Sequence, residues 1–199
     1  VTTGMRIERG WISPLYVTEP EEGTCVMENA YVITVGEKIS SVNQLIGILE
    51  QIRQYGNSRP FLLICDDIDQ VVNATLIQNV LRGALRCCVI KAVEFGDARK
   101  NLMQDIAVAT GGNYLCEETG HCLADATIQD LGSAKKVIVS NDSPIIVEGA
   151  GDPEKIKERA DILAKRLSVP NITDYEKSKY ERRIAGLVGG IGVIRAGGA

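Results

Sequence analysis

The chain has 199 residues, of which 45% are hydrophobic and 24% are charged, and this composition is typical of a folded globular domain rather than of a disordered segment. Its 22 basic and 26 acidic residues give a net charge of −4, which argues against the electropositive surface that nucleic-acid binding requires. The longest apolar runs, such as 61–65, are far shorter than the roughly 20 residues that cross a bilayer. We therefore expect one domain that binds neither nucleic acid nor a membrane.

Predicted strands and helices alternate along most of the chain. Short runs rich in β-branched residues predict strands at 31–35, 61–65, 87–93, 137–139 and 145–147. Helical spacing and capping signals predict helices from residue 40 or 41 through 52, and at 70–85, 98–109 and 127–131. This order predicts a mixed α/β domain.

Two stretches are more apolar than a single buried stripe needs. The segment 9–16 combines turn signals at Gly10 and Pro14 with four large apolar side chains, namely Trp11, Ile12, Leu15 and Tyr16. The first predicted helix spreads its apolar side chains over an arc of about 160°; they are Val42, Leu45, Ile46, Ile48, Leu49 and Ile52. These side chains either pack in the core or, if they are exposed side by side, form a binding patch.

The last quarter of the chain is predicted to be helical. Ile156, Ala160 and Leu163 keep helical spacing, and this helical pattern ends near Pro170. A capping-box pattern at 173–176 then begins a last helix. We expect an αα-hairpin that packs on the rest of the domain. A glycine-rich stretch at 186–198 follows and is interpreted as a linker or as the start of another segment.

Cys116, His121 and Cys122 are the residues that would carry a thiol- or metal-dependent enzyme activity. Their spacing does not match the paired ligands of structural zinc sites, and no orienting acid or oxyanion hole is recognisable around them. We expect no metal site. The six cysteines of the chain are interpreted as reduced thiols; they are Cys25, Cys65, Cys87, Cys88, Cys116 and Cys122.

An acidic stretch and a glycine run offer two further alternatives. Asp66, Asp67 and Asp69 follow a predicted strand, where they could bind a hard cation or simply begin a helix. The run 189–192 is glycine-rich, but it follows a helix instead of joining a strand to a helix, as a phosphate-binding loop does. We interpret it as a helix end.

Several motifs, in order along the whole chain, resemble the apical domain of the group I (GroEL-type) chaperonins. They are Gly4-Met5, the segment Arg9–Pro14, the segments Phe95–Lys100 and Gln104–Ala107, Thr110-Gly111-Gly112, the segment Ala126–Gly132 and the stretch 180–194. The resemblance covers essentially all 199 residues. It implies an apical polypeptide-binding domain at 1–188 and the start of an intermediate-domain segment at 189–199.

The resemblance also implies a fold and a binding site. The fold would be a β-sandwich-like core flanked by helices, with an apolar groove between two helices that receives non-native polypeptide and the mobile loop of a co-chaperonin. Carried onto this sequence, the groove residues are Trp11, Leu15, Tyr16, Ile46, Leu49, Asn73, Ile77 and Gln78. Asn73 and Gln78 are polar where the family typically has apolar residues, so replacing them by Leu and Val is expected to strengthen peptide binding.

The resemblance places nucleotide chemistry outside this chain. ATP and Mg²⁺ would bind to an equatorial domain built from sequence before Val1 and after Ala199, so no cofactor is expected within it and the chain is not expected to be an enzyme. The full-length protein would form a homo-oligomeric ring in the bacterial cytoplasm or in an organelle matrix or stroma. Two alternatives remain: a divergent, structural ring subunit that binds clients weakly, and the thiol or metal enzyme described above.

Overall fold

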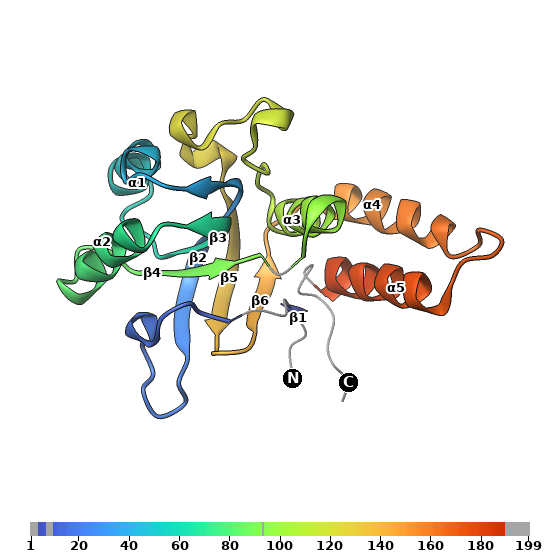
Figure 1. Cartoon of the computed structure of the whole chain (residues 1–199), viewed down its shortest axis with the longest axis horizontal. Helices are drawn as coiled ribbons and strands as arrows, with labels where there is room; N and C mark the ends of the chain where they lie inside the picture. Colours follow the sequence, from blue (N-terminus) through green and yellow to red (C-terminus); the bar gives the residue numbers. More distant parts are fainter. Residues whose placement is uncertain (1–3, 7–9, 93, 190–199) are drawn as a thin grey trace.

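The computed structural model describes residues 4–6, 10–92 and 94–189, and the strands within them form one six-stranded sheet in the order β1-β6-β5-β2-β3-β4 (Figure 1). The strands are β1 (Gly4–Arg6), β2 (Cys25–Ile39), β3 (Phe61–Ile68), β4 (Cys87–Lys91), β5 (Gly132–Val139) and β6 (Pro144–Gly149). The α-helices are α1 (Asn43–Tyr55), α2 (Gln70–Leu81), α3 (Gly96–Thr110), α4 (Pro153–Arg166) and α5 (Asp174–Gly189). The mixed α/β class is confirmed.

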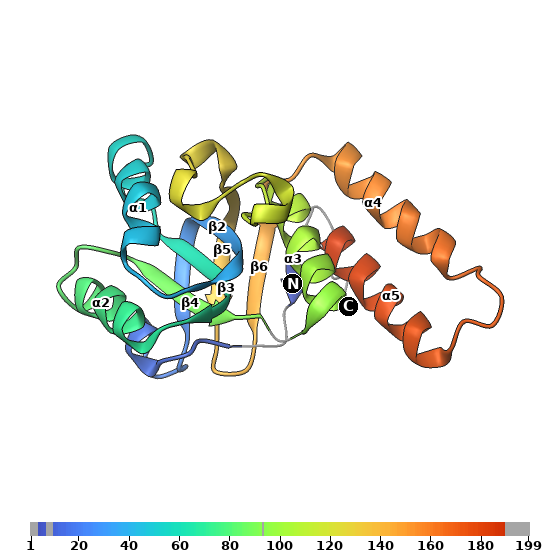
Figure 2. The same cartoon turned by 45° about the horizontal axis from the view of Figure 1, so that its top comes forward.

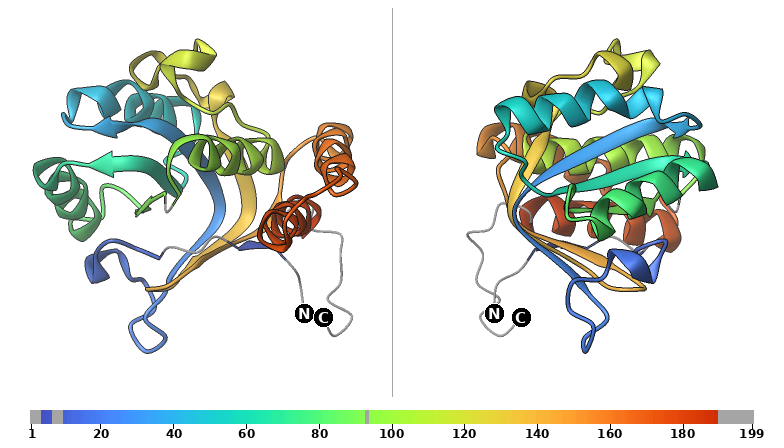
Figure 3. Two further views of the ribbon diagram at one scale, coloured as in Figure 1. Left: turned by 45° about the vertical axis from the view of Figure 1, so that its right-hand side comes forward. Right: turned by 90° about the vertical axis from the view of Figure 1, so that its left-hand side faces the viewer.

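Strand β2 joins two halves of the sheet that differ in strand direction. Its later part pairs in parallel with β3, which pairs in parallel with β4, whereas its earlier part pairs antiparallel with β5. The ribbon of β2 bends strongly along its 15 residues (Figure 3). The resemblance implied a β-sandwich-like core, but the described strands form a single curved sheet, because β2 runs through both halves and hydrogen-bonds them together.

Helices α1 and α2 connect the three parallel strands and lie at the same end of the molecule (Figure 1). Helix α1 buries Leu45, Ile48 and Ile52, which recur on one side of the helix. Helix α2 begins where a carboxylate oxygen of Asp69 accepts a hydrogen bond from the backbone N–H of Val71. Both helices therefore pack their apolar sides against the parallel half of the sheet.

Several boundaries differ from the predicted ones. Helix α2 ends at Leu81 and not at residue 85, because Gly83 adopts a φ of +77° and turns the chain away. The helix predicted at 127–131 is a single 3-10 turn, η4 (Ile128–Asp130). Strand β2 begins at Cys25, earlier than predicted, and both β1 and the 3-10 turn η1 (Pro14–Tyr16) were not predicted.

The C-terminal αα-hairpin is confirmed by α4 and α5, which pack against each other and against α3. A buried carboxylate holds the hairpin in place: Asp105 of α3 is 0% exposed. Its oxygens accept hydrogen bonds from Arg159 Nε at 2.6 Å, from Arg183 Nε at 2.7 Å and from Arg183 Nη2 at 3.0 Å. The segment boundary predicted at 188/189 falls at the end of α5, and residues 190–199 lie outside the described residues.

Candidate functional site

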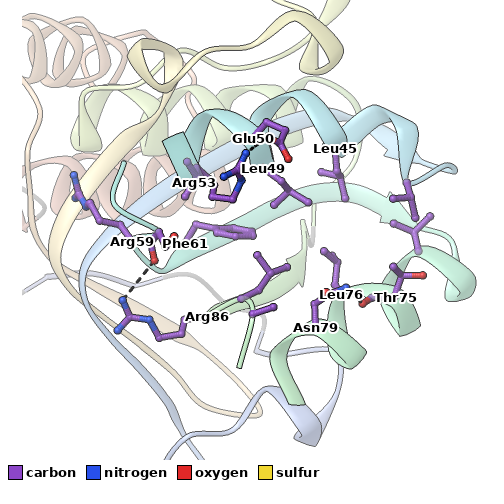
Figure 4. Close-up of a pocket in the computed structure, with 16 residues that line it drawn as sticks. Leu45, Leu49, Glu50, Arg53, Arg59, Phe61, Thr75, Leu76, Asn79 and Arg86 are labelled. Carbon is purple, nitrogen blue, oxygen red and sulfur yellow. Dashed lines mark hydrogen bonds and ion pairs between the residues drawn. The ribbon is translucent and has the colours of Figure 1, made fainter. Parts of the chain in front are cut away.

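A groove lies between α1 and α2. It encloses about 280 Å³, and the ring of Phe61 from β3 lies between the two helices (Figure 4). Besides Phe61, the apolar side chains that line it come from α1 and its N-cap, from α2 and from the turn after α2. These are Val42, Leu45, Leu49, Ile52, Val72, Leu76, Ala84 and Leu85.

Large apolar side chains are exposed on the elements that surround this groove. Val71 and Leu81 at the two ends of α2 are 72% and 66% exposed, and Ile46 of α1 is 49% exposed. On the other side of α2, Leu15 of η1 is 51% exposed, and η1 packs directly against α2. Exposed apolar side chains around a groove are typical of a surface that binds another molecule.

The eight site residues expected from the resemblance lie on both sides of α2, and not all of them reach the groove. Leu49 forms part of the groove wall and is half-buried, and Ile46 is exposed on the same helix. Leu15 is exposed on η1, whereas Trp11 is half-buried and its indole N–H donates to the carbonyl oxygen of Gly23 at 3.0 Å. Gln78 is exposed on α2 and does not line the groove.

Tyr16, Asn73 and Ile77 make contacts within the domain in this structure, rather than being exposed for contact with a ligand. Tyr16 is 1% exposed, and its hydroxyl donates a hydrogen bond to Oδ1 of Asn73. Burial raises the pKa of the Tyr16 hydroxyl well above its ordinary value. Ile77 is 9% exposed and belongs to the core. The expectation that Asn73 offers a free polar group to a ligand is therefore corrected, because its side chain already bonds to Tyr16.

The sequence reasoning missed the groove residues of β3 and α2 and the exposed residues Val71 and Leu81. One signal was available: Val71 and Val72 are adjacent on α2, and two consecutive residues of a helix point about 100° apart, so both cannot face the core fully. The basic residues at one end of the groove, Arg53, Arg59 and Arg86, were also missed, because they come from three separate segments.

The candidate residues for enzyme chemistry lie around η2 (Glu117–Thr119) and η3 (Leu123–Asp125), and η3 packs against α1. Cys116 is buried and forms an isolated antiparallel bridge with His121, whose Nδ1 lies 3.6 Å from Oδ1 of Asp130. Cys122 is half-buried. In the part of the chain that the structure describes, no three side chains of the metal-binding types gather closely enough to hold an ion.

The acidic stretch was expected to follow a strand, but Asp66 and Asp67 lie within β3 and only Asp69 follows it, and all three are engaged in structural contacts. Asp67 lies 3.0 Å from Nζ of Lys91 and 3.9 Å from that of Lys38, and the hydrogen bond from Lys91 holds the pKa of Asp67 below its usual range. Asp66 lies 3.5 Å from Arg99, and Asp69 caps α2. The helix-start interpretation of Asp69 is confirmed.

No protein-family model matches this chain. Among the described residues, no helix is both long and apolar enough to cross a membrane.

Proposed function

We propose that this chain is a polypeptide-binding domain of the apical type found in group I chaperonins. It would hold apolar segments of non-native polypeptides, and the mobile loop of a co-chaperonin, against the face formed by α1, α2 and η1. The observation that carries the proposal is the apolar groove between α1 and α2 with exposed Ile46, Val71 and Leu81 around it. The collinear motifs that resemble the chaperonin apical domain support the same assignment.

Binding at such a face needs no catalytic group. Burying one large aliphatic side chain contributes about 1.5–3 kcal/mol, and the exposed Ile46 and the half-buried Leu49 stand three residues apart along α1. Because apolar burial is non-directional, the face would accept many sequences that share an apolar pattern. ATP and Mg²⁺ would act in a separate equatorial domain, and the full-length protein would present this face in a homo-oligomeric ring.

Fluorescence anisotropy with a labelled amphipathic peptide tests the proposal. Leu49→Ser and Ile46→Ser should each weaken binding by about 1–3 kcal/mol, because each removes one aliphatic contact. Ile162→Ser is the matched control: Ile162 is also an exposed aliphatic residue, 59% exposed, but it lies on α4, away from α1 and α2 (Figure 2). Equal losses in all three variants, or no binding by the parent chain, would contradict the proposal.

A structural ring subunit with weak client binding is the second candidate, and the exposed polar side chain of Gln78 on α2 favours it. In that case the parent chain would bind the peptide weakly, and Gln78→Val would strengthen binding only if position 78 contacts the ligand. We therefore expect the affinity of the parent chain to separate the two candidates, and Gln78→Val to show whether position 78 contacts the ligand.

A further inference from the structure

The two ends of the groove between α1 and α2 differ in charge. Arg53, Arg59 and Arg86 all belong to the end of the groove that contains Phe61, where the side chains of Arg59 and Arg86 point apart, whereas the opposite end carries Leu45 and Thr75 (Figure 4). One acidic residue, Glu50, also lines the groove. This local excess of positive charge is unexpected on a chain whose net charge is −4, and it identifies an end of the groove that attracts anions.

The contacts of these arginines leave most of their charge uncompensated. Arg53 pairs with Glu50 at 2.6 Å. Arg59 donates from Nε to the carbonyl oxygen of Asn29 at 2.8 Å, and its guanidinium lies 4.0 Å from the centre of the Tyr31 ring. Within the described residues neither Arg59 nor Arg86 has a carboxylate partner.

Arg86 bonds only weakly to its surroundings. Its Nη2 lies 3.5 Å from the carbonyl oxygen of Ser58, and the residue is exposed. Arg59 is half-buried and is held by its ring and backbone contacts. One guanidinium is thus fixed in place and the other can adjust, and both retain N–H groups that can donate to an added acceptor.

We propose that the groove selects an apolar peptide segment that is bordered on one side by acidic side chains. The apolar residues would occupy the space between Leu49 and Leu76, and a carboxylate would accept hydrogen bonds from Arg59 and Arg86. This inference rests on the proposed function and adds the class of segment that the groove prefers. Arginine suits the role because its planar donors match the geometry of a carboxylate.

The length of the groove determines how long the bound apolar peptide segment can be. From Val42 to Arg53 helix α1 rises by about 17 Å, and an extended peptide covers that distance with about five residues. The acidic side chains should therefore adjoin an apolar core of about this length, because a carboxylate placed in the middle would be buried among aliphatic side chains without a partner.

Peptides with one apolar core and variable flanks test the inference. The five-residue core would carry two Glu, two Gln or two Lys residues, placed before the core in one set and after it in another, with both termini blocked. In at least one set the Glu peptide should bind the parent chain about three- to tenfold more tightly than the Gln peptide, and the Lys peptide less tightly than the Gln peptide. The preference should shrink at high salt.

Variants that remove one positive charge at a time show which arginines cause the preference for the Glu peptide. Arg86→Gln should reduce the Glu-over-Gln ratio by about threefold, and Arg59→Gln with Arg86→Gln should abolish it. Arg166→Gln, the same change at an exposed position at the end of α4, should leave the ratio unchanged. Arg86→Gln alone remains informative if the double variant does not fold, because the hydrogen bond from the Arg86 side chain to Ser58 is long and exposed.

The outcomes separate this inference from the function on which it rests. Equal binding of the Glu, Gln and Lys peptides in both sets would overturn the inference and leave the apolar face as a polypeptide-binding site. A preference that persists in Arg86→Gln at full strength would also overturn it. If no peptide binds at all, the proposed function itself fails.

Discussion

The hydroxyl of Tyr16 and the side chain of Asn73 form a polar contact where η1 packs against α2. Such a contact fixes the position of η1, and with it the exposed Leu15, relative to the helix. A polar helix residue can thus serve the interior of the protein, because a buried hydroxyl needs a hydrogen-bond partner. The two residues are 57 positions apart in the chain, so spacing alone could not pair them.

We predict that Asn73→Leu destabilises the domain by about 1–3 kcal/mol, because it leaves the buried Tyr16 hydroxyl without its acceptor. Adding Tyr16→Phe to Asn73→Leu should recover part of this loss, since the orphaned hydroxyl is then removed. Urea denaturation of the two single variants and the double variant measures the coupling. Strictly additive effects would show that the contact contributes nothing to stability.

The buried thiols provide a second prediction at the scale of single residues. Burial raises the pKa of Cys65 to about 12, so almost none of it is thiolate in the folded protein at pH 8. We expect iodoacetamide to modify the half-buried Cys122 first and Cys65 only after unfolding. Peptide mapping after timed alkylation measures the order, and equal rates at the two sites would contradict the burial of Cys65.

The same pKa shift makes stability depend on alkaline pH. The folded pKa of Cys65 is raised above its ordinary value of 9.0, so the protonated thiol favours the folded state. Its contribution is therefore complete below about pH 9 and is lost as the pH rises toward 12. Thermal unfolding of Cys65→Ala should show a smaller fall in Tm over this window than the parent chain.

Among the secondary-structure elements, the C-terminal hairpin depends most clearly on one interaction. Asp105 of α3 accepts hydrogen bonds from Arg159 of α4 and from Arg183 of α5, so a single carboxylate connects three helices. The hairpin itself was predictable from the spacing of Ile156 and Ala160 and from the capping pattern at 173–176, which the structure contains. The role of Asp105 in holding the hairpin was not predictable, because helical spacing shows which side of a helix is buried but not which charged side chains pair.

We predict that Asp105→Ala lowers the free energy of unfolding by about 3–5 kcal/mol, because it leaves two partly buried guanidinium groups unpaired. Hydrogen exchange of amides in α4 and α5 should accelerate more than that in β3. Asp161→Asn is the control: Asp161 pairs with Lys157 at 3.1 Å on the exposed side of α4. It should change stability by less than about 0.5 kcal/mol, and a comparable loss there would argue against a special role for Asp105.

On the scale of the whole molecule, the groove and the docked hairpin lie at opposite ends (Figure 2). Helices α1 and α2 occupy one end, and α4 and α5 the other, with the sheet and α3 between them. Perturbations at well-separated sites without shared contacts usually add. The two ends of the molecule should therefore respond independently.

We predict that Asp105→Ala, measured where it remains folded, binds a labelled amphipathic peptide within about twofold of the parent affinity. In the reverse direction, Leu49→Ser should leave hydrogen exchange in α4 and α5 unchanged. Anisotropy titration and exchange mass spectrometry test the two directions. A large loss of affinity in the hairpin variant would reveal coupling across the sheet.

The overall class could be predicted from the sequence more readily than the shape of the sheet or of the site. Short apolar runs located β3 and β4, and their alternation with helices indicated the α/β class. The full length of β2 was not predicted, because it contains Asn29, a residue type that is rare in strands and that adopts a φ of +51° here. The groove gathers Phe61, Leu49 and Arg86 from separate elements, and only the tertiary fold brings them together.

Strand β1 has a consequence for self-association. It pairs with β6 through Gly4–Val147, Met5–Ile146 and Arg6–Ile145, and so occupies the edge of the sheet that β6 would otherwise present. Among the described residues, three residues of β1 cover this edge, and their partners in β6 are more than a hundred positions away. The pairing therefore closes a very long loop and should form late in folding. Whenever β1 detaches, the β-branched edge of β6 is left open to strand addition from another molecule, and aggregation would begin there.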